Sequence, residues 1–235
     1  DDDALNLFRD QIRRFADSEI APHAPAWHDE DRLIPIGIVD KIAAMGVFGL
    51  TVPETYGGLG LGKLAMCVVS EELSRGYLGV GSLGTRSEIA AELIRHSGTS
   101  AQREKYLPKL CSGEWVGSMA MSEPAIGTDV MGMQTTAVRK GDKYVINGRK
   151  MWITNGTIDE NKTPCDLILV YAKTGEKNGR NLISTFLVEK AFPGFYVGQK
   201  IMDKLGMRAS NTAELVFENC QIPASALVGH EGDSM

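Results

Sequence analysis

The spacing of apolar residues changes once along this chain, near Trp115, and this change constrains the fold more than any other feature. Before Trp115, apolar residues recur three or four positions apart, as in Phe8, Ile12 and Phe15, which is typical of helices buried on one face. After Trp115, short segments rich in β-branched and aromatic residues are separated by turns that contain glycine. We therefore expect an α+β fold, in which an N-terminal helical domain is followed by an antiparallel, barrel-like β-domain.

Proline and glycine residues set the ends of the expected helices. Pro22 and Pro25 should end the first helix, and Gly46 the second. The fourth helix is expected only after Gly84, the last residue of a glycine-rich segment, and should end before Gly98. After the first helix, the expected helices span about 36–45, 64–74, 85–96 and 101–110.

Turn residues divide the second half into expected strands. Lys140–Asp142 and Asn147–Gly148 are both expected to form hairpin turns, and 174–181 a polar loop. The expected strands are 135–138, 143–146, 150–154, 167–172, 184–188, 195–199 and 213–218. The boundary between the helical and the β-domain should fall near 113–116.

The overall composition is that of an ordinary globular protein. The chain has 235 residues, of which 43% are hydrophobic and 23% charged, and a net charge of −5. This charge gives no electrostatic reason to expect a nucleic acid or an anionic membrane as partner. The four cysteines lie far apart, so we expect reduced thiols and no metal site, and no apolar run is long enough for a membrane span.

Two polar segments carry the strongest indication of a binding site. In the first, 120–129, the hydroxyl of Ser122 follows an apolar strand that Pro124 stops, Gly127 is expected to turn the chain, and Thr128 adds a second hydroxyl. In the second, 150–156, a strand presents an indole and a third hydroxyl. These groups would suit a flat ring with a hydrogen-bonding edge and a diphosphate tail.

Together with 205–212, these segments resemble the flavin-binding signature of the acyl-CoA dehydrogenase family. The resemblance implies an N-terminal helical domain (1–115), a middle β-domain (116–228), and the start of a connection (229–235) to a C-terminal helical bundle that is absent from this chain. It implies FAD as cofactor, bound by Met119, Met121, Ser122, Thr128, Trp152 and Thr154.

The motif departs from the family pattern at one position. Ile126 stands where the family usually has a small residue, immediately before Gly127. A branched side chain limits the turn to ordinary φ values, so we expect the phosphate contact of Thr128 to be displaced or less exposed.

The resemblance also implies a reaction, α,β-dehydrogenation of an acyl-CoA thioester, in which a carboxylate removes the α-proton and the β-hydride passes to the flavin. In the family the base is a glutamate of the C-terminal domain, so we expect no catalytic residue in this chain. We expect the other glutamates considered to be helix-surface charges (Glu71, Glu72, Glu88 and Glu92) or part of the flavin turn (Glu123).

Arg86 is the expected determinant of the acyl group. It begins an apolar stripe that continues through Ile89, Ala90, Leu93 and Ile94, so its guanidinium needs an anion. The anion can be a protein carboxylate or a substrate carboxylate, and snorkelling to solvent is a further alternative. Segment 81–90 is similar to family members that act on methylsuccinyl-CoA, whereas 198–200 and 203–208 resemble those that act on isovaleryl-CoA. We expect the dicarboxylic substrate, with isovaleryl-CoA as the alternative.

The remaining predictions concern the coenzyme end and the partners. Thr128 is expected to contact the CoA substrate. Arg180 either contacts the CoA phosphates or is a solvated loop residue, and Arg208 either positions the thioester or ties loops together. The family resemblance implies electron-transferring flavoprotein as partner, a homotetramer, and the bacterial cytoplasm or mitochondrial matrix as location. Other functions considered are an acyl-CoA oxidase, a flavin monooxygenase of the same fold, and a non-catalytic binding protein; only the last predicts a natural protein that ends near Met235.

Overall fold

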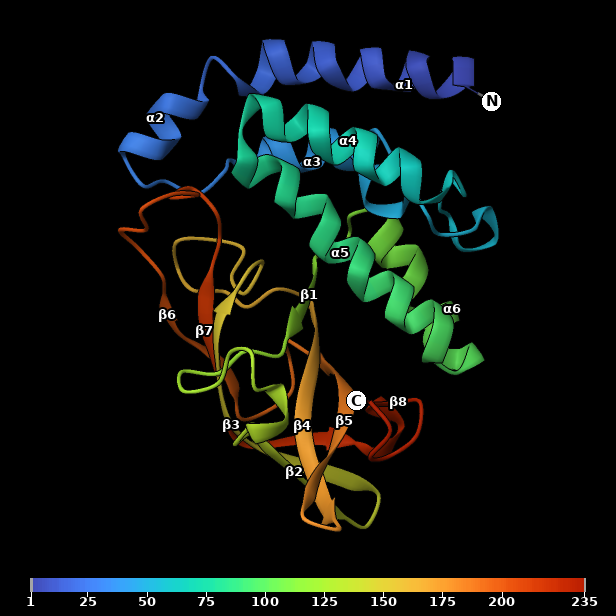
Figure 1. Ribbon diagram of the computed structural model, residues 1–235, viewed down its shortest axis with the longest axis vertical. Coiled ribbons are helices and arrows are strands. Elements are labelled where there is room, and N and C mark those ends of the chain that lie inside the picture. Colours follow the sequence, from blue (N-terminus) through green and yellow to red (C-terminus); the bar gives the residue numbers. More distant parts are fainter. Residues whose placement is uncertain (1, 235) are drawn as a thin grey trace.

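The computed structural model describes residues 2–234, with side chains from residue 5 onward. Its first half is helical and lies at one end of the molecule, above the sheet in Figure 1. The helices are α1 (Asp2–Phe15), continued by a π-helical turn (Ala16–Ile20), α2 (Ala24–Asp29), α3 (Ile36–Ala44), α4 (Gly62–Gly76), α5 (Leu78–Ser97) and α6 (Ser100–Cys111). In the part of the chain described, no helix is both long enough and apolar enough to cross a membrane.

Two expected helix boundaries are wrong, and both involve residues usually regarded as helix breakers. Pro25 does not end a helix but lies in the first turn of α2, where a backbone N–H is not needed. α5 begins at Leu78 and includes the glycine-rich segment through Gly84. A Cβ on Gly81 would collide with the Oγ of Ser74 in α4, so this glycine permits close packing of the two helices.

The second half forms one sheet of eight strands. Along the sheet the order is β6-β7-β3-β2-β4-β5-β8, and β1 pairs with β4 off this path. The strands are β1 (Gly117–Ala120), β2 (Thr136–Lys140), β3 (Lys143–Ile153), β4 (Leu167–Lys177), β5 (Arg180–Glu189), β6 (Phe195–Lys200), β7 (Ala213–Pro223) and β8 (Leu227–Val228). The α+β class is therefore confirmed.

The sheet is mixed and not wholly antiparallel as expected. β1 runs parallel to β4, and β2 meets β4 in parallel at Thr136 and Lys173, while the other pairs are antiparallel. A parallel pair needs a long connection, and here the β2–β3 hairpin and the loop 154–166 separate β1 from β4. The first strand can therefore enter the sheet in the same direction as the fourth.

Two expected turns are also wrong. Asn147–Gly148 lies inside β3, opposite a β-bulge whose extra residue belongs to β7, between Phe217 and Cys220. Gly148 is required there because a Cβ would lie 2.4 Å from the Oγ1 of Thr135. The expected polar loop 174–181 is the end of the β4–β5 hairpin, and its two turn residues, Asn178 and Gly179, have φ of 52° and 74° as a tight hairpin turn requires.

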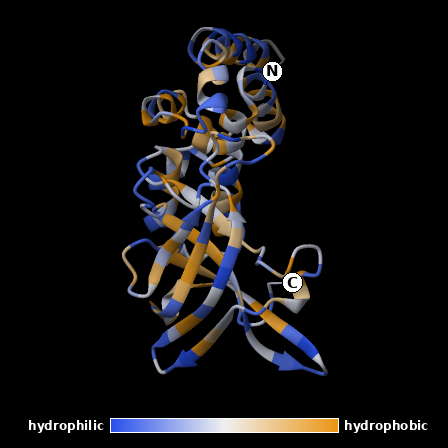
Figure 2. Cartoon of the chain, turned by 90° about the vertical axis from the view of Figure 1, so that its left-hand side faces the viewer, coloured by the Kyte–Doolittle hydropathy of each residue, from blue (hydrophilic) through white to orange (hydrophobic). Residues whose placement is uncertain are grey.

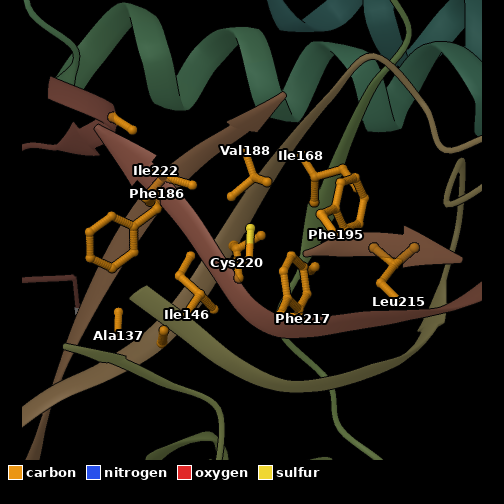
Figure 3. Close-up of a cluster of buried hydrophobic side chains, with 14 of the residues drawn as sticks. Ala137, Ile146, Ile168, Phe186, Val188, Phe195, Leu215, Phe217, Cys220 and Ile222 are labelled. Carbon is orange, nitrogen blue, oxygen red and sulfur yellow. The ribbon is translucent and has the colours of Figure 1, made fainter. Parts of the chain in front are cut away.

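The core is continuous between the two halves because β4 and β5 are buried on both faces. Ile168 and Phe186 point into the apolar cluster of the sheet shown in Figure 3. The alternate residues Leu167, Leu169 and Leu187 pack against α5 and α6. Figure 2 shows apolar residues along the middle of the strands and polar residues toward the hairpin tips at the bottom of the view. The helical half thus rests on the sheet beside β1, next to the first polar segment.

Candidate functional site

The two polar segments lie side by side at the ends of β1 and β3. The backbone N–H of Met151 donates to the carbonyl of Ser122 at 3.0 Å. The hydroxyl of Ser118 donates to the carbonyl of Thr154 at 2.6 Å. The structure therefore brings Ser122 and the Trp152 segment onto adjacent stretches of backbone, as a shared site requires.

Helix α5 closes the same corner of the molecule. The hydroxyl of Ser87 accepts the N–H of Gly117 at 3.1 Å. The side chain of Asn155, which directly follows Thr154, donates to the carbonyls of Leu83 and Gly117 at 3.4 and 3.2 Å. Residues of α5 near Arg86 thus contact Gly117, at the start of the strand that leads into the first polar segment, and Asn155, near the end of the second.

Trp152 has an unusual conformation for a tryptophan in a strand. Its φ is 66°, in the left-handed region, and its side chain is 61% exposed. The register of β3 against β7 shifts between Lys150 and Ile153, so Trp152 lies in a β-bulge that turns the indole out of the sheet. A bulky residue in this region is strained, and such strain is found mainly where a ligand is bound.

The predicted cofactor contacts around Trp152 are half-buried. Ser122 and Thr154 are half-buried, and no described residue hydrogen-bonds either hydroxyl. Met119 and Met121 are half-buried on one side of their strand, where they pack against a small cluster of Met133, Tyr171 and Ile183. Methionine adapts its shape to what it contacts, so this edge combines two free hydroxyls with a soft apolar surface.

The turn of the first segment lies earlier than expected. Glu123 and Ile126 exchange backbone hydrogen bonds of 3.0 and 3.1 Å around Pro124. Gly127 is not in the left-handed region, so the chain turns before it and not at it. Proline favours the second position of such a turn, and Ile126 fits the last position without positive φ. Thr128, beyond the turn, is exposed. The expected displacement of its contact with a phosphate stays a prediction.

Beside Ser122 lies a buried ion pair. The Nζ of Lys150, which is fully buried, lies 2.9 Å from Oε1 of Glu123 and donates to the carbonyl of Met121 at 2.9 Å. Burial raises the pKa of Glu123, but hydrogen bonds from Thr135, Gln134 and Lys150 outweigh it and hold the pKa below its usual value. Burial lowers the pKa of Lys150. The hydrogen bond to Glu123 and its negative charge act in the opposite direction and raise this pKa, but burial outweighs them.

Sequence reasoning missed Lys150, although one signal pointed to it. Tyr144 and Ile146 face the core of the sheet, and Lys150 lies in the same alternating phase of β3. A lysine at an inward position of a strand indicates a buried cation with a dedicated partner. Glu123, expected as part of the flavin turn, is that partner.

Arg86 lies on the half-buried face of α5 with Ile89 and Leu93, while Ala90 and Ile94 of the expected stripe are buried. Among the residues that the structure describes, no carboxylate lies within ion-pair distance of Arg86. The structure therefore shows no salt bridge between Arg86 and a carboxylate of the described residues. The other two alternatives, a substrate carboxylate and contact with solvent, stay open.

Arg180 lies at a different place, next to the segment that contains Thr128. It is the exposed first residue of β5 and borders a groove of about 1010 Å³ together with Asp129 and Met131. The side chain of Asn181 donates to the carbonyl of Met131 at 2.7 Å and holds the two segments together. The structure thus places Arg180 with the Thr128 segment, while Arg86 does not border this groove.

The expectation for the helix glutamates is partly wrong. Glu71 is exposed, but Glu72 and Glu88 are only 2% and 1% exposed because both α4 and α5 are covered by other elements. Glu72 is held by Arg13 and Arg75 at 2.6 and 3.2 Å. Glu88 accepts the N–H of Thr51 at 2.6 Å, and its Oε2 has no partner among the described residues, so burial raises its pKa.

Glu92 and Arg208 both have partners within the protein. Glu92 is half-buried and lies 2.8 Å from Arg95 one turn further along α5, so it is a helix charge with a partner on the same helix. Arg208 donates to the carbonyl of His28 at 3.0 Å and lies 3.5 Å from Asp203. Of the two alternatives for Arg208, the structure shows the contact that ties a loop of the sheet to the helical half.

Comparison with known protein families assigns nearly the whole chain to one family. Residues 2–114 match the family of acyl-CoA dehydrogenase N-terminal domains, and residues 118–220 match the middle domain. The chain therefore belongs to the acyl-CoA dehydrogenase family, of which it carries the helical N-terminal and β-sheet middle parts.

Two individual dehydrogenases are similar to this chain over nearly its whole length. The chain is 46% identical to (2S)-methylsuccinyl-CoA dehydrogenase of Cereibacter sphaeroides, over 97% of this chain and 42% of that protein. It is 44% identical to mitochondrial isovaleryl-CoA dehydrogenase of Arabidopsis thaliana, over 98% of this chain and 55% of that protein. The chain thus spans about half the length of these relatives.

A solved structure with a bound flavin is also similar. A glutaryl-CoA dehydrogenase from Mycobacterium smegmatis in complex with FADH2 superimposes with a TM-score of 0.87 at 31% identity, over 98% of this chain and 57% of that one. The outward indole of Trp152 and the unpartnered hydroxyls of Ser122 and Thr154 are groups that fit a planar, hydrogen-bonding cofactor. The residues present therefore fit a flavin.

Proposed function

We propose that this chain provides the N-terminal and middle domains of an FAD-dependent acyl-CoA dehydrogenase. The observation that carries the proposal is the convergence of the two polar segments, with Trp152 turned outward at a bulge beside Ser122. The likeness to a dehydrogenase structure that holds FADH2 supports it. When bound, the flavin would accept the hydride from the β-carbon of the substrate.

The residues of this chain would bind and orient that cofactor. Ser122 and Thr154 have free hydroxyls for the edge of the ring, and Trp152 offers an indole against it. Met119 and Met121 would provide an apolar surface beside the ring, and Thr128 a contact for the phosphate end. A site of this kind excludes water from one side of the ring and leaves the other open to substrate.

We assign proton removal to no residue of this chain. Glu123 is the buried carboxylate next to Ser122, but Lys150 and two backbone amides already neutralise and bind it. A carboxylate in that state is a poor base, because its pKa is held low. The proposal therefore requires the base to come from the C-terminal domain that the family resemblance implies.

For the acyl group we propose a short branched dicarboxylic substrate, (2S)-methylsuccinyl-CoA, which would be converted to mesaconyl-CoA. Arg86 supports this, because a half-buried guanidinium without a carboxylate partner among the described residues offers a site for the free carboxylate. The 46% identity to a methylsuccinyl-CoA dehydrogenase also supports it. The alternative is isovaleryl-CoA, favoured by the 44% identity to an isovaleryl-CoA dehydrogenase.

The coenzyme end and the partners complete the proposal. Arg180, beside the groove of about 1010 Å³, would bind a phosphate of CoA, and Thr128 lies on the adjoining segment. We propose electron-transferring flavoprotein as electron acceptor and a homotetramer as the assembly. Since the relatives include a bacterial protein and a mitochondrial one, we propose the bacterial cytoplasm or the mitochondrial matrix as location.

Anaerobic titration of the complete protein with acyl-CoA substrates tests the function. We expect methylsuccinyl-CoA to bleach the flavin absorbance and isovaleryl-CoA to do so only weakly. Stronger bleaching by isovaleryl-CoA would overturn the dicarboxylic substrate and leave the dehydrogenase intact. Rapid reoxidation of the reduced protein by air would favour an oxidase of the same fold, and a protein that never binds flavin would contradict the whole proposal.

A further inference from the structure

The buried pair of Lys150 and Glu123 is not accounted for by the proposed reaction. Lys150 is fully buried and Glu123 is 4% exposed. Burying a charged pair is costly, and apolar residues of similar volume usually stabilise a fold equally well or better. Tyr144 and Ile146, which share the inward phase of β3, show that this face of the strand accepts apolar side chains. The pair therefore needs a reason beyond the stability of the sheet.

The contacts of Lys150 enclose Ser122 from both sides along the chain. Its Nζ donates to the carbonyl of Met121 at 2.9 Å, and to the carboxylate of Glu123 at 2.9 Å. These are the residues immediately before and after Ser122. The carbonyl of Ser122 itself accepts the N–H of Met151, the neighbour of Lys150, at 3.0 Å. Ser122 is thus held at its own carbonyl, at the carbonyl of Met121 and through the side chain of Glu123.

The contacts of Glu123 extend this control to the next loop. One carboxylate oxygen accepts the N–H of Gln134 at 2.6 Å and the other accepts the N–H of Thr135 at 3.0 Å. The loop 124–133, which includes Thr128, therefore begins and ends at the same carboxylate. On β3, Lys150 lies two residues before Trp152. Three predicted cofactor contacts, one in each of these segments, are connected through a single ion pair.

We propose that Lys150 and Glu123 are positioning residues, which hold Ser122, the loop 124–133 and the bulge at Trp152 in the arrangement that binds the flavin. Neither residue is assigned a contact with the substrate or a step of the reaction. The ligand named here rests on the proposed function, whereas the connection between the three segments rests only on the contacts above.

A second buried glutamate provides a matched control. Glu72 is 2% exposed and is bound by Arg13 at 2.6 Å, so it joins α1 to α4 with similar chemistry. It has no contact with either polar segment. Glu72→Gln should therefore disturb the fold locally without changing the geometry at Ser122. A general loss of stability would affect both pairs in the same way, whereas a positioning role would not.

The double variant Lys150→Met/Glu123→Gln is the main test. It removes both charges, so no unpaired charge stays buried, and the protein is expected to fold even where Lys150→Met alone does not. In the complete protein freed of flavin, we expect hydrogen exchange in peptides covering 121–135 and 150–154 to rise about tenfold or more relative to wild type. Glu72→Gln should accelerate exchange only in α1 and α4.

The same variants are then titrated with FAD. We expect the double variant to bind FAD about tenfold or more weakly, with shifted flavin absorption bands, while Glu72→Gln binds as wild type does. Wild-type exchange in both segments of the double variant would overturn the inference, as would FAD affinity within about twofold of wild type. A wild-type protein that never binds FAD would refute the proposed function and the ligand named here, while the exchange measurement would still decide whether the pair connects the segments.

Discussion

Glu72 in the helical half and Glu123 at the end of β1 are both buried carboxylates held by a cation, but their surroundings differ. The partners of Glu72, Arg13 and Arg75, have side chains that are 48% and 46% exposed, so both guanidinium groups keep contact with water. The partner of Glu123, Lys150, is fully enclosed. The first pair joins two helices with little loss of hydration, because its arginines stay in contact with water. The second pair requires the complete removal of an ammonium group from water, so its desolvation free energy is much larger.

The same contrast holds for the backbone around the two pairs. Among the residues described before Gly117, Asp31 is the only non-glycine residue with positive φ. Near Glu123, Trp152 has a φ of 66°. Backbone strain of this kind gathers where a structure is shaped for a ligand. The strained bulge at Trp152 therefore marks this end of the sheet as the candidate cofactor site.

Substitutions in the two ion pairs should change the stability of the protein by different amounts. Lys150→Met leaves the carboxylate of Glu123 buried without its cation and should lower the free energy of unfolding by about 3–5 kcal/mol. Glu72→Gln keeps a hydrogen-bond acceptor beside two solvated arginines and should cost about 1–2 kcal/mol. Urea denaturation of both variants measures the difference. Equal losses would mean that the two pairs are energetically alike.

The next effect concerns the substrate. Replacing Arg86 with methionine removes the proposed partner of the free carboxylate, so the KM for methylsuccinyl-CoA should rise about 10- to 100-fold. The KM for isovaleryl-CoA, which has no such carboxylate, should change little. Steady-state kinetics with both substrates measures the ratio, and the unfolding midpoint of the variant serves as the control for folding. An equal rise for both substrates would remove Arg86 from carboxylate recognition.

Trp152 distinguishes binding from stability within the sheet. Asparagine tolerates positive φ better than tryptophan, so Trp152→Asn should leave the flavin-free protein as stable as wild type or up to about 1 kcal/mol more stable. The same change should weaken FAD binding, and Trp152→Phe should retain most of the affinity because it keeps an aromatic ring. Thermal unfolding and FAD titration measure the two quantities. A large loss of stability in Trp152→Asn would identify the indole as part of the core.

The smallest effect lies in the helical half and depends on pH. Burial raises the pKa of Glu88, so the unfolded chain loses this proton at lower pH than the folded protein does. Stability therefore falls as the pH rises from the unfolded value of about 4.3 through the folded pKa. Glu88→Gln should remove this loss and stabilise the protein by about 1 kcal/mol at pH 8, with little effect at pH 4. An equal effect at both pH values would contradict the assigned cause.

Local patterns were sufficient to predict the fold class and several elements. Gly46 has a φ of 77° directly after the helix 36–45 expected from its apolar residues, and Lys140–Asp142 encloses the turn of the β2–β3 hairpin. The start of α5 could not be predicted in this way, because it depends on the close approach of Gly81 to Ser74 of α4, which leaves no room for a Cβ. The parallel pairing of β1 with β4 depends in the same way on segments far apart in the sequence.

The candidate site was predictable as a set of residues but not as an arrangement. Sequence alone indicated Ser122 and Trp152, and it did not indicate that the latter would lie in a bulge with positive φ. Lys150 was overlooked because lysine is usually exposed, although its place in the strand pattern marked it as inward. Glu72 and Glu88 were expected at the surface because helix periodicity identifies only one apolar face, and neighbouring elements cover the rest.

A crystal structure of the complete protein grown with FAD would show directly whether the two polar segments bind the flavin. We predict that the isoalloxazine ring lies against the indole of Trp152 and that the hydroxyl of Ser122 is hydrogen-bonded to the edge of the ring. Lys150 should still be paired with Glu123. A flavin bound elsewhere, with Trp152 facing solvent and Ser122 making no contact, would contradict this prediction.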